Sequence, residues 1–157
     1  MIRLKIDYGK RNIGIDVYVW DKSENKFQKL YALFDTGAHT CSIDSDLIQR
    51  LGYNLDDATK SYITTATKTN ETVKRLRIDK IKLDNTEINS VLFNTFEFPI
   101  ISHQVILGMN VIRHFEVNMN FKNRLITMNE NYLDSDDDYY DTDIFGDWRA
   151  DKKDLNA

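Results

Sequence analysis

One aspartate, Asp35, stands directly at the end of an apolar run. Residues 30–34 read LYALF, and Asp35 follows them, with Thr36, Gly37 and Ala38 next. Apolar runs of this kind end up in protein cores, where a lone ionised carboxylate costs several kcal/mol unless a partner compensates it. The position of Asp35 therefore requires a fold that provides its carboxylate with a partner.

Composition indicates a globular protein of one domain. The chain has 157 residues, of which 41% are hydrophobic and 29% charged, and this length is sufficient for a real core. No apolar run approaches the roughly 20 residues that span a bilayer, and the N-terminal residues lack the apolar stretch of a signal peptide. Cys41 is the single cysteine, which excludes an intramolecular disulfide and fits a reducing compartment. We expect a cytoplasmic protein.

Charge is distributed unevenly along the chain. Residues 134–157 contain nine aspartates and three basic residues, a net charge of −6, so residues 1–133 carry +2 (18 basic and 16 acidic residues). Dense acidic segments of this kind usually stay solvated. We therefore predict a folded domain at 1–133 and a flexible acidic tail at 134–157. The near-neutral body has no basic stripe, so we expect neither a nucleic-acid partner nor a membrane partner.

The body has the pattern of a mainly β protein. Period-two alternation and β-branched runs predict strands at residues 2–8, 13–20, 27–34, 60–67, 71–83, 86–93, 105–107, 116–120 and 124–128. Polar residues between Trp20 and Phe27, and the pair Asp84-Asn85, predict hairpin turns. We therefore expect an all-β fold.

Two short helices are predicted within this β pattern. Segment 44–53 has Asp44 or Ser45 as a cap, an apolar face, and Gly52 at its end. A second turn of helix is predicted with Asn110 as its cap, and it runs through His114.

Two motifs together resemble the retropepsin-like aspartic proteases, the retroviral-type, single-domain relatives of pepsin. The first is FDTGAHTCSI at 34–43, which a predicted helix follows, and the second is VILG at 105–108, whose glycine stands 73 positions after Asp35. Aspartate-threonine-glycine alone is weak evidence, but both motifs at this distance in a β-rich chain are much stronger. The resemblance covers roughly residues 13–128. It implies an acid-protease half-barrel with one lobe per chain, assembled as a two-fold homodimer.

The same resemblance implies a homodimeric aspartic endopeptidase that hydrolyses peptide bonds without metal or organic cofactor. Its catalytic residue is Asp35, and protein or peptide chains are its substrates. Two carboxylates that share one proton activate a water in this chemistry. Pepsin-like chains supply both carboxylates from two lobes, whereas the triplet occurs once here. The partner of Asp35 is then Asp35 of a second copy of the chain.

Neighbouring residues take supporting roles from the resemblance. The hydroxyl of Thr36 bonds across the dimer, and Gly37 lets the backbone turn tightly so that its N–H approaches the carboxylate. Ala38 lacks the hydroxyl of the serine found there in many pepsins, so we expect a working range nearer neutral pH. The hydrophobic-glycine element that packs beneath this loop consists of Ile106, Leu107 and Gly108.

The candidate flap over the cleft departs from the family pattern. Family members usually carry glycine near the flap tip, often after a Thr-Ala pair. Here the pair is Thr65-Ala66, and Thr67, Lys68 and Thr69 stand where glycine is expected. A non-catalytic, protease-like module for dimerisation or peptide binding is therefore the alternative function.

Several residues also have simpler interpretations. Asp35 alone fits a turn aspartate that caps the following loop. We interpret Cys41 as a small buried residue rather than a nucleophile, because no histidine has a context that marks it as its base. His39 is expected on a surface loop, with the rim of the cleft as the alternative. His103 and His114 lack metal-ligand spacing, so no metal site is predicted.

The acidic tail leaves three possibilities open. A freely solvated segment is the simplest. The alternatives are a tail that restrains the enzyme by lying over its own cleft, since such clefts bind extended peptides, and a tail that belongs to the subunit interface.

Overall fold

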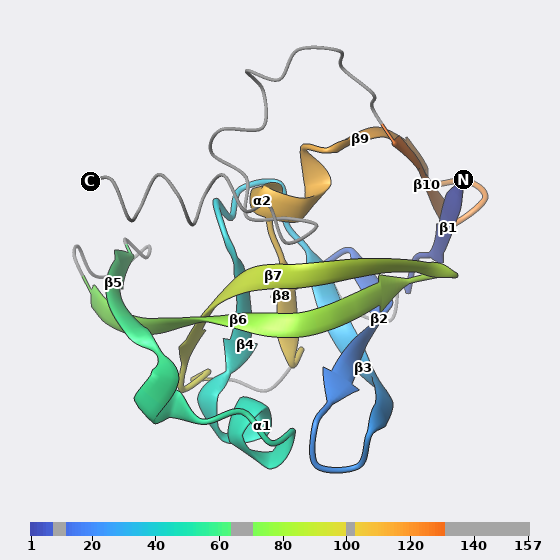
Figure 1. The fold of residues 1–157 in the computed structure, drawn as a ribbon. Helices are drawn as coiled ribbons and strands as arrows, with labels where there is room; N and C mark the ends of the chain where they lie inside the picture. Colours follow the sequence, from blue (N-terminus) through green and yellow to red (C-terminus); the bar gives the residue numbers. More distant parts are fainter. Residues whose placement is uncertain (8–11, 64–70, 100–102, 131–157) are drawn as a thin grey trace.

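The computed structural model describes residues 1–7, 12–63, 71–99 and 103–130 (Figure 1). The predicted tail at 134–157 lies outside the described residues, and so do the candidate flap residues Thr65, Ala66, Thr67, Lys68 and Thr69. Within the described part of the chain, no helix combines the length and the apolar character that crossing a membrane requires.

The described residues form ten strands, two short α-helices and one turn of 3-10 helix. The strands are β1 (Ile2–Lys5), β2 (Gly14–Asp21), β3 (Lys26–Phe34), β4 (Cys41–Asp44), β5 (Thr59–Ile63), β6 (Glu71–Leu83), β7 (Thr86–Phe96), β8 (Val105–Leu107), β9 (Phe115–Asn120) and β10 (Leu125–Glu130). The helical segments are α1 (Ser45–Arg50), α2 (Met109–Ile112) and the 3-10 turn Leu55–Asp57. The predicted all-β class is confirmed.

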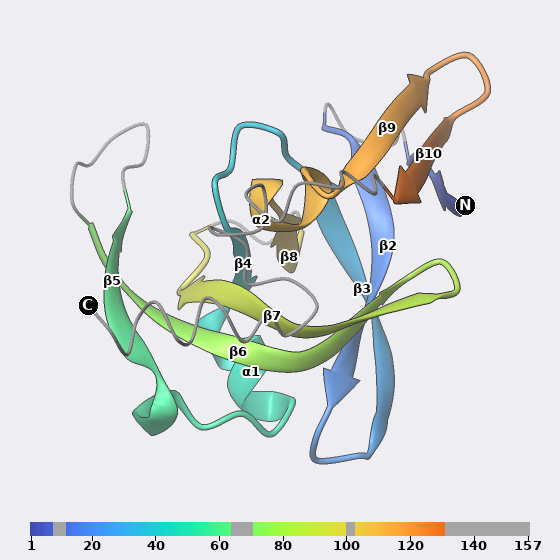
Figure 2. The ribbon, with the colours of Figure 1, turned by 45° about the horizontal axis from the view of Figure 1, so that its top comes forward.

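Seven of these strands form one sheet that closes on itself. Their order is β2-β3-β8-β4-β7-β6-β5, and β2 also pairs with β6, where Tyr18 faces Lys82 and Val19 faces Ile81. The other three strands form a separate antiparallel sheet in the order β1-β10-β9, which stands at one side of the molecule beside β2 (Figure 2). The larger sheet therefore wraps around one core as a partly closed barrel.

The core is built from the inward faces of these strands. Alternate residues of β2 are buried, and Val17, Val19, Ile81 and Ile88 have no exposed surface. Because successive side chains of a strand point to opposite faces, this burial pattern matches the period-two alternation in the sequence. Burying side chains of this size stabilises the fold by about 1.5–3 kcal/mol each.

Two parallel strand pairs lie next to each other in the larger sheet. β3 pairs in parallel with β8, so that Leu33 faces Ile106, and β4 pairs in parallel with β7, so that Ser42 faces Asn94. β4 and β8 also pair with each other, antiparallel, through Ser42 and Ile106. This arrangement places the end of β3 next to β8, although about 70 residues separate them in the sequence.

The long β6–β7 hairpin changes its buried face part-way along. Leu76 and Ile78 are buried before the change and Ile81 after it, so the buried positions shift by one residue. Asp79 and Ser90 are skipped in the pairing of the two strands, and Ser90 has a φ of 54° in the left-handed region. The change leaves the residues next to Leu76 on the opposite face of the sheet from the core.

The first helix agrees with its prediction and the second does not. Asp44 caps α1 by accepting a hydrogen bond from the Leu47 N–H at 3.3 Å, and Gly52 follows with a φ of 90°. The assignment of Asn110 as a cap is wrong, because α2 begins at Met109 directly after Gly108 and Asn110 lies inside it. The side chain of Asn110 instead bonds to backbone groups of other segments. β4 and the 3-10 turn were missed, since each is too short to show a period.

A buried carboxylate organises the turn between β2 and β3. Asp21 accepts hydrogen bonds from the Ser23 hydroxyl at 2.6 Å, the Gln28 side chain at 2.8 Å, and the N–H groups of Ser23 and Glu24 at 2.9 and 3.0 Å. The pKa of Asp21 is lowered to about 2, mainly by the hydrogen bond from the Ser23 hydroxyl. Burial acts in the opposite direction and raises this pKa. The folded protein therefore keeps this carboxylate ionised in acid.

We expect Asp21 to make the stability of the fold depend on acid pH. Its folded pKa is below the unfolded value, so its contribution is complete above about pH 4 and is lost as pH falls towards about 2. Asp21→Asn should lower the free energy of unfolding at pH 7. In this variant the free energy of unfolding should also decrease less between pH 4 and pH 2 than in the wild type. Urea unfolding across this pH range measures both effects. Asp16→Asn, at an exposed carboxylate on the same strand, is the control, and equal pH slopes for Asp21→Asn and the wild type would contradict the prediction.

Candidate active site

Asp35 follows the last residue of β3 and is held by backbone hydrogen bonds. Its N–H donates to the Leu107 carbonyl at 3.0 Å, and its own carbonyl accepts from the Ala38 N–H at 3.2 Å. The Gly37 N–H donates to the Asp35 carboxylate at 2.9 Å. Since each of these bonds involves the main chain, the position of the carboxylate is set by the fold rather than by a side-chain neighbour.

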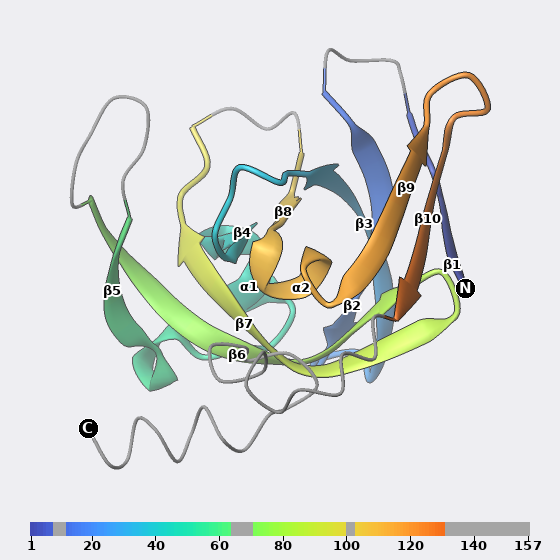
Figure 3. The same ribbon diagram turned by 90° about the horizontal axis from the view of Figure 1, so that it is seen from above.

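Backbone hydrogen bonds connect the loop after Asp35 to α2. The N–H groups of Met109 and Asn110 donate to the carbonyls of Ala38 at 2.7 Å and His39 at 3.0 Å. Figure 3 shows this loop, between β3 and β4, next to α2 and β8. The N-terminal end of α2 therefore satisfies loop carbonyls that would otherwise lack partners.

The buried side chain of Asn110 bridges three segments. Its Oδ1 accepts from the Cys41 N–H at 2.8 Å, and its Nδ2 donates to the Leu92 carbonyl at 2.9 Å. These bonds connect α2 to β4 and β7. Buried amide groups without partners are destabilising by about 1–3 kcal/mol, and this asparagine satisfies one backbone group on β4 and one on β7.

Gly108 makes the closest contact beneath the loop. A Cβ at this position would lie 2.7 Å from the Thr40 carbonyl carbon and 2.9 Å from the Cys41 nitrogen. The Gly108 N–H also points at the Cys41 sulfur, at 3.2 Å. Only glycine therefore permits the loop and β8 to approach this closely.

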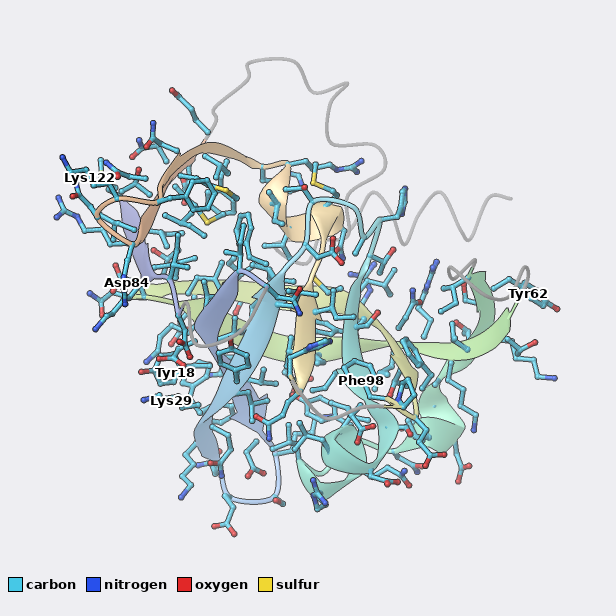
Figure 4. All side chains as sticks on the ribbon, turned by 180° about the vertical axis from the view of Figure 1, so that it is seen from behind. Tyr18, Lys29, Tyr62, Asp84, Phe98 and Lys122 are labelled. Atoms are coloured by element: carbon cyan, nitrogen blue, oxygen red, sulfur yellow. The ribbon has the colours of Figure 1, made fainter. Side chains whose placement is uncertain are left out.

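A cavity of about 540 Å³ opens beside Asp35. It is lined by Asp35, Gly37, Ala38, His39, Thr40, Ser42, Tyr62, Ile63, Arg75, Asn94, Phe96 and Ile106. Tyr62 lies near the end of β5, at the edge of the molecule (Figure 4), and 65% of its surface is exposed. The cavity is therefore a cleft that is large enough for part of a peptide.

Comparison with known proteins identifies the family. The family model described as "gag-polyprotein putative aspartyl protease" matches residues 25–114, which is more than half of the chain and includes both motifs. The chain belongs to this aspartyl protease family. A crystal structure of a retropepsin-like aspartic protease from Rickettsia conorii has a similar fold, with a TM-score of 0.60 and 16% sequence identity over 82% of this chain and 89% of that chain. No curated protein matches the sequence. The predicted retropepsin-like family and half-barrel fold are confirmed.

The predicted site residues that the structure describes lie around the cleft or beneath its loop. Asp35 and Ala38 line it, and Thr36 lies exposed on the same loop. Leu107 and Gly108 are buried beneath the loop, whereas Ile106 lines the cleft. Their roles in catalysis and in the dimer remain predictions.

Cys41 is buried, whereas His39 lies at the cleft. Cys41 is confirmed as buried, with no exposed surface. His39 is exposed and lines the cleft, so it lies at the rim that was its alternative position. Among the described residues, no group of three or more metal-ligating side chains lies close enough together to hold a metal ion.

Sequence reasoning missed seven residues that line the cleft, and it also missed the bridging role of Asn110. The seven are Thr40, Ser42, Tyr62, Ile63, Arg75, Asn94 and Phe96. Asn110 stands two positions after Gly108 in the motif segment, and this spacing was an available signal. Ser42, Arg75 and Asn94 had no such signal, because they reach the cleft only through the pairing of β4, β6 and β7.

We expect Gly108→Ala to destabilise the folded protease by about 2 kcal/mol or more. Its Cβ would meet the backbone of Thr40 and Cys41, and overpacking of this kind commonly costs about 1–3 kcal/mol. Gly37→Ala is the matched control, since its Cβ would meet only the Asp35 carboxylate, at 3.2 Å. Guanidinium unfolding measures both variants, and equal losses of stability would contradict the expectation.

Cys41 should be unreactive in the native protein. It has no exposed surface, and burial raises the pKa of its thiol to about 12, so it supplies almost no thiolate at neutral pH. Iodoacetamide at pH 8 should leave the folded protein unmodified and alkylate it once in denaturant, as mass spectrometry detects. Rapid alkylation of the folded protein would instead support a nucleophilic role.

Proposed function

We propose that this protein is a homodimeric aspartic endopeptidase in which each chain contributes Asp35 to one active site. The observation that carries the proposal is the position of Asp35: its carboxylate borders the cleft, and the Gly37 N–H and the pairing of β3 with β8 hold it there. Membership of the aspartyl protease family supports the reaction class.

A second copy supplies the group that one chain lacks. Of the residues that line the described cleft, Asp35 is the only carboxylate, and activation of water by this route requires two. A two-fold axis next to Asp35 brings two identical carboxylates together without any further residue. This arrangement also provides the partner that the sequence required.

In the proposed reaction the two carboxylates divide the roles of base and acid. The ionised one accepts a proton from a water, whose oxygen attacks the carbonyl carbon of the scissile peptide bond. The protonated one transfers its proton to the carbonyl oxygen, which becomes a hydroxyl of the tetrahedral intermediate. Cleavage of the C–N bond with proton transfer to nitrogen releases an amine and a carboxylic acid.

Asp35→Asn should abolish cleavage of a mixed peptide library, with a loss of at least about a thousandfold. It should also inhibit the wild type on mixing. With equal amounts of both chains, only about a quarter of the dimers contain two aspartates, so activity per wild-type chain should fall to about a half. Rates across a series of mixing ratios, after equilibration, measure this effect.

Asp46→Asn, at an exposed carboxylate of α1, should retain full activity and serves as the control. Unchanged activity per wild-type chain on mixing would exclude a shared site. A wild type that cleaves no peptide at all would favour the alternative, a protease-like module that binds peptides or dimerises without hydrolysis.

A further inference from the structure

Four side chains on neighbouring strands form a continuous row along the cleft. Ile106 on β8 faces Ser42 on β4, Ser42 faces Asn94 on β7, and Asn94 faces Arg75 on β6. All four line the cavity next to Asp35. This row, which we call the cleft floor, runs from an apolar residue near the catalytic loop to a cation.

Arg75 is positioned in the cleft floor by its neighbour. Its Nε donates to Asn94 Oδ1 at 2.9 Å, and the Asn94 side chain is only 3% exposed. Leu76, the next residue on β6, points into the core, so Arg75 is held on the cleft face by strand geometry. A guanidinium has five N–H donors, and this bond to Asn94 orients the group while it uses one of them.

Among the side chains that the structure describes, no carboxylate forms an ion pair with Arg75. The ion pairs Lys22–Asp79 and Lys29–Asp16 lie elsewhere and are exposed. Arg75 is half-buried and is the only lysine or arginine among the described residues that line the cavity. A cation partly withdrawn from water and oriented by a buried amide is suited to bind a carboxylate from a ligand.

We propose that Arg75 makes this cleft selective for peptides that carry an acidic side chain close to the scissile bond. The inference rests on the proposed function, in which the cavity binds the substrate. A glutamate or aspartate side chain that lies along the cleft floor passes the small, polar Ser42 and Asn94 and meets the guanidinium. A lysine or arginine in the same place would bring two cations together.

The two-fold symmetry of the proposed dimer extends this preference. Each chain contributes one cleft floor, so an Arg75 lies on either side of the paired Asp35 carboxylates. The enzyme should therefore favour acidic residues at one position before the scissile bond and at the equivalent position after it.

Matched peptides test the proposal. A cleaved peptide from the library is resynthesised with a single glutamate moved one position at a time across the scissile bond, each version with a glutamine counterpart. We expect glutamate to raise kcat/KM at least about tenfold over glutamine at one position on each side. Arg75→Gln should reduce this ratio to about one, and Arg75→Glu should favour lysine in the same place. Added salt should reduce the wild-type ratio.

Lys74→Gln is the control, because it removes the same charge from the adjacent, exposed residue of β6 and should keep the ratio. If Arg75 only supported Asn94, Arg75→Gln would slow both peptides of a pair equally, and the proposal would be wrong. Equal cleavage of glutamate and glutamine peptides by the wild type would overturn it as well, with the protease function intact.

Peptide binding to Asp35→Asn, measured by fluorescence anisotropy, separates this inference from the proposed function. If the glutamate peptides bind more tightly than their glutamine counterparts, and adding Arg75→Gln removes this difference, the proposed role of Arg75 is supported even when the wild type cleaves nothing. Equal affinities for both peptides of every pair would contradict it.

Discussion

The contact between Gly108 and the backbone at Thr40–Cys41 is the constraint on which the site depends. It lets β8 and the loop after Asp35 approach to a distance that no other residue allows. The hydrogen bonds from Asp35 to Leu107 and from α2 to the loop carbonyls require this approach. Asn110 then satisfies the remaining buried groups at Cys41 and Leu92. The half-buried carboxylate of Asp35 is therefore held by a tightly packed support, whose backbone groups at Ala38, His39, Cys41 and Leu92 have hydrogen-bond partners.

Strand register decides which residues reach the cleft. The cleft floor exists because four strands align Ile106, Ser42, Asn94 and Arg75 on one face. A slip of one residue in β6 would turn Arg75 into the core and Leu76 into the cleft. The buried face of the β6–β7 hairpin changes at Asp79 and Ser90, so both halves of the hairpin pack against the core.

The proposed division of one active site between two chains would tie the activity to assembly. In the proposed dimer each chain supports its own carboxylate and contributes only that one to the reaction. The active fraction would then depend on protein concentration, and a folded but unpaired chain would be inert. The proposed symmetry would also repeat every feature of the cleft, so a preference built into one chain would apply on both sides of the scissile bond.

The sequence by itself determined the local elements and indicated the family. Period-two alternation predicted the long strands, Asp44 and Gly52 marked the ends of α1, and the two motifs indicated the family and Asp35. These features depend on residues close together in the chain, whose spacing is visible without a fold. The three-residue β8 was predicted from its apolar run, whereas the four-residue β4 showed no pattern of its own.

Tertiary structure alone decided how these elements combine. The insertion of β4 between β7 and β8, the bridging role of Asn110 and the place of Arg75 beside Asn94 all join residues that lie 18 to 69 positions apart. In the sequence, Asn110 resembled a helix cap, and nothing in the strand pattern at 71–83 distinguished Arg75. Their functions depend on which backbone groups and which strand face they meet, and only the closed sheet, through its pairing register, determines that.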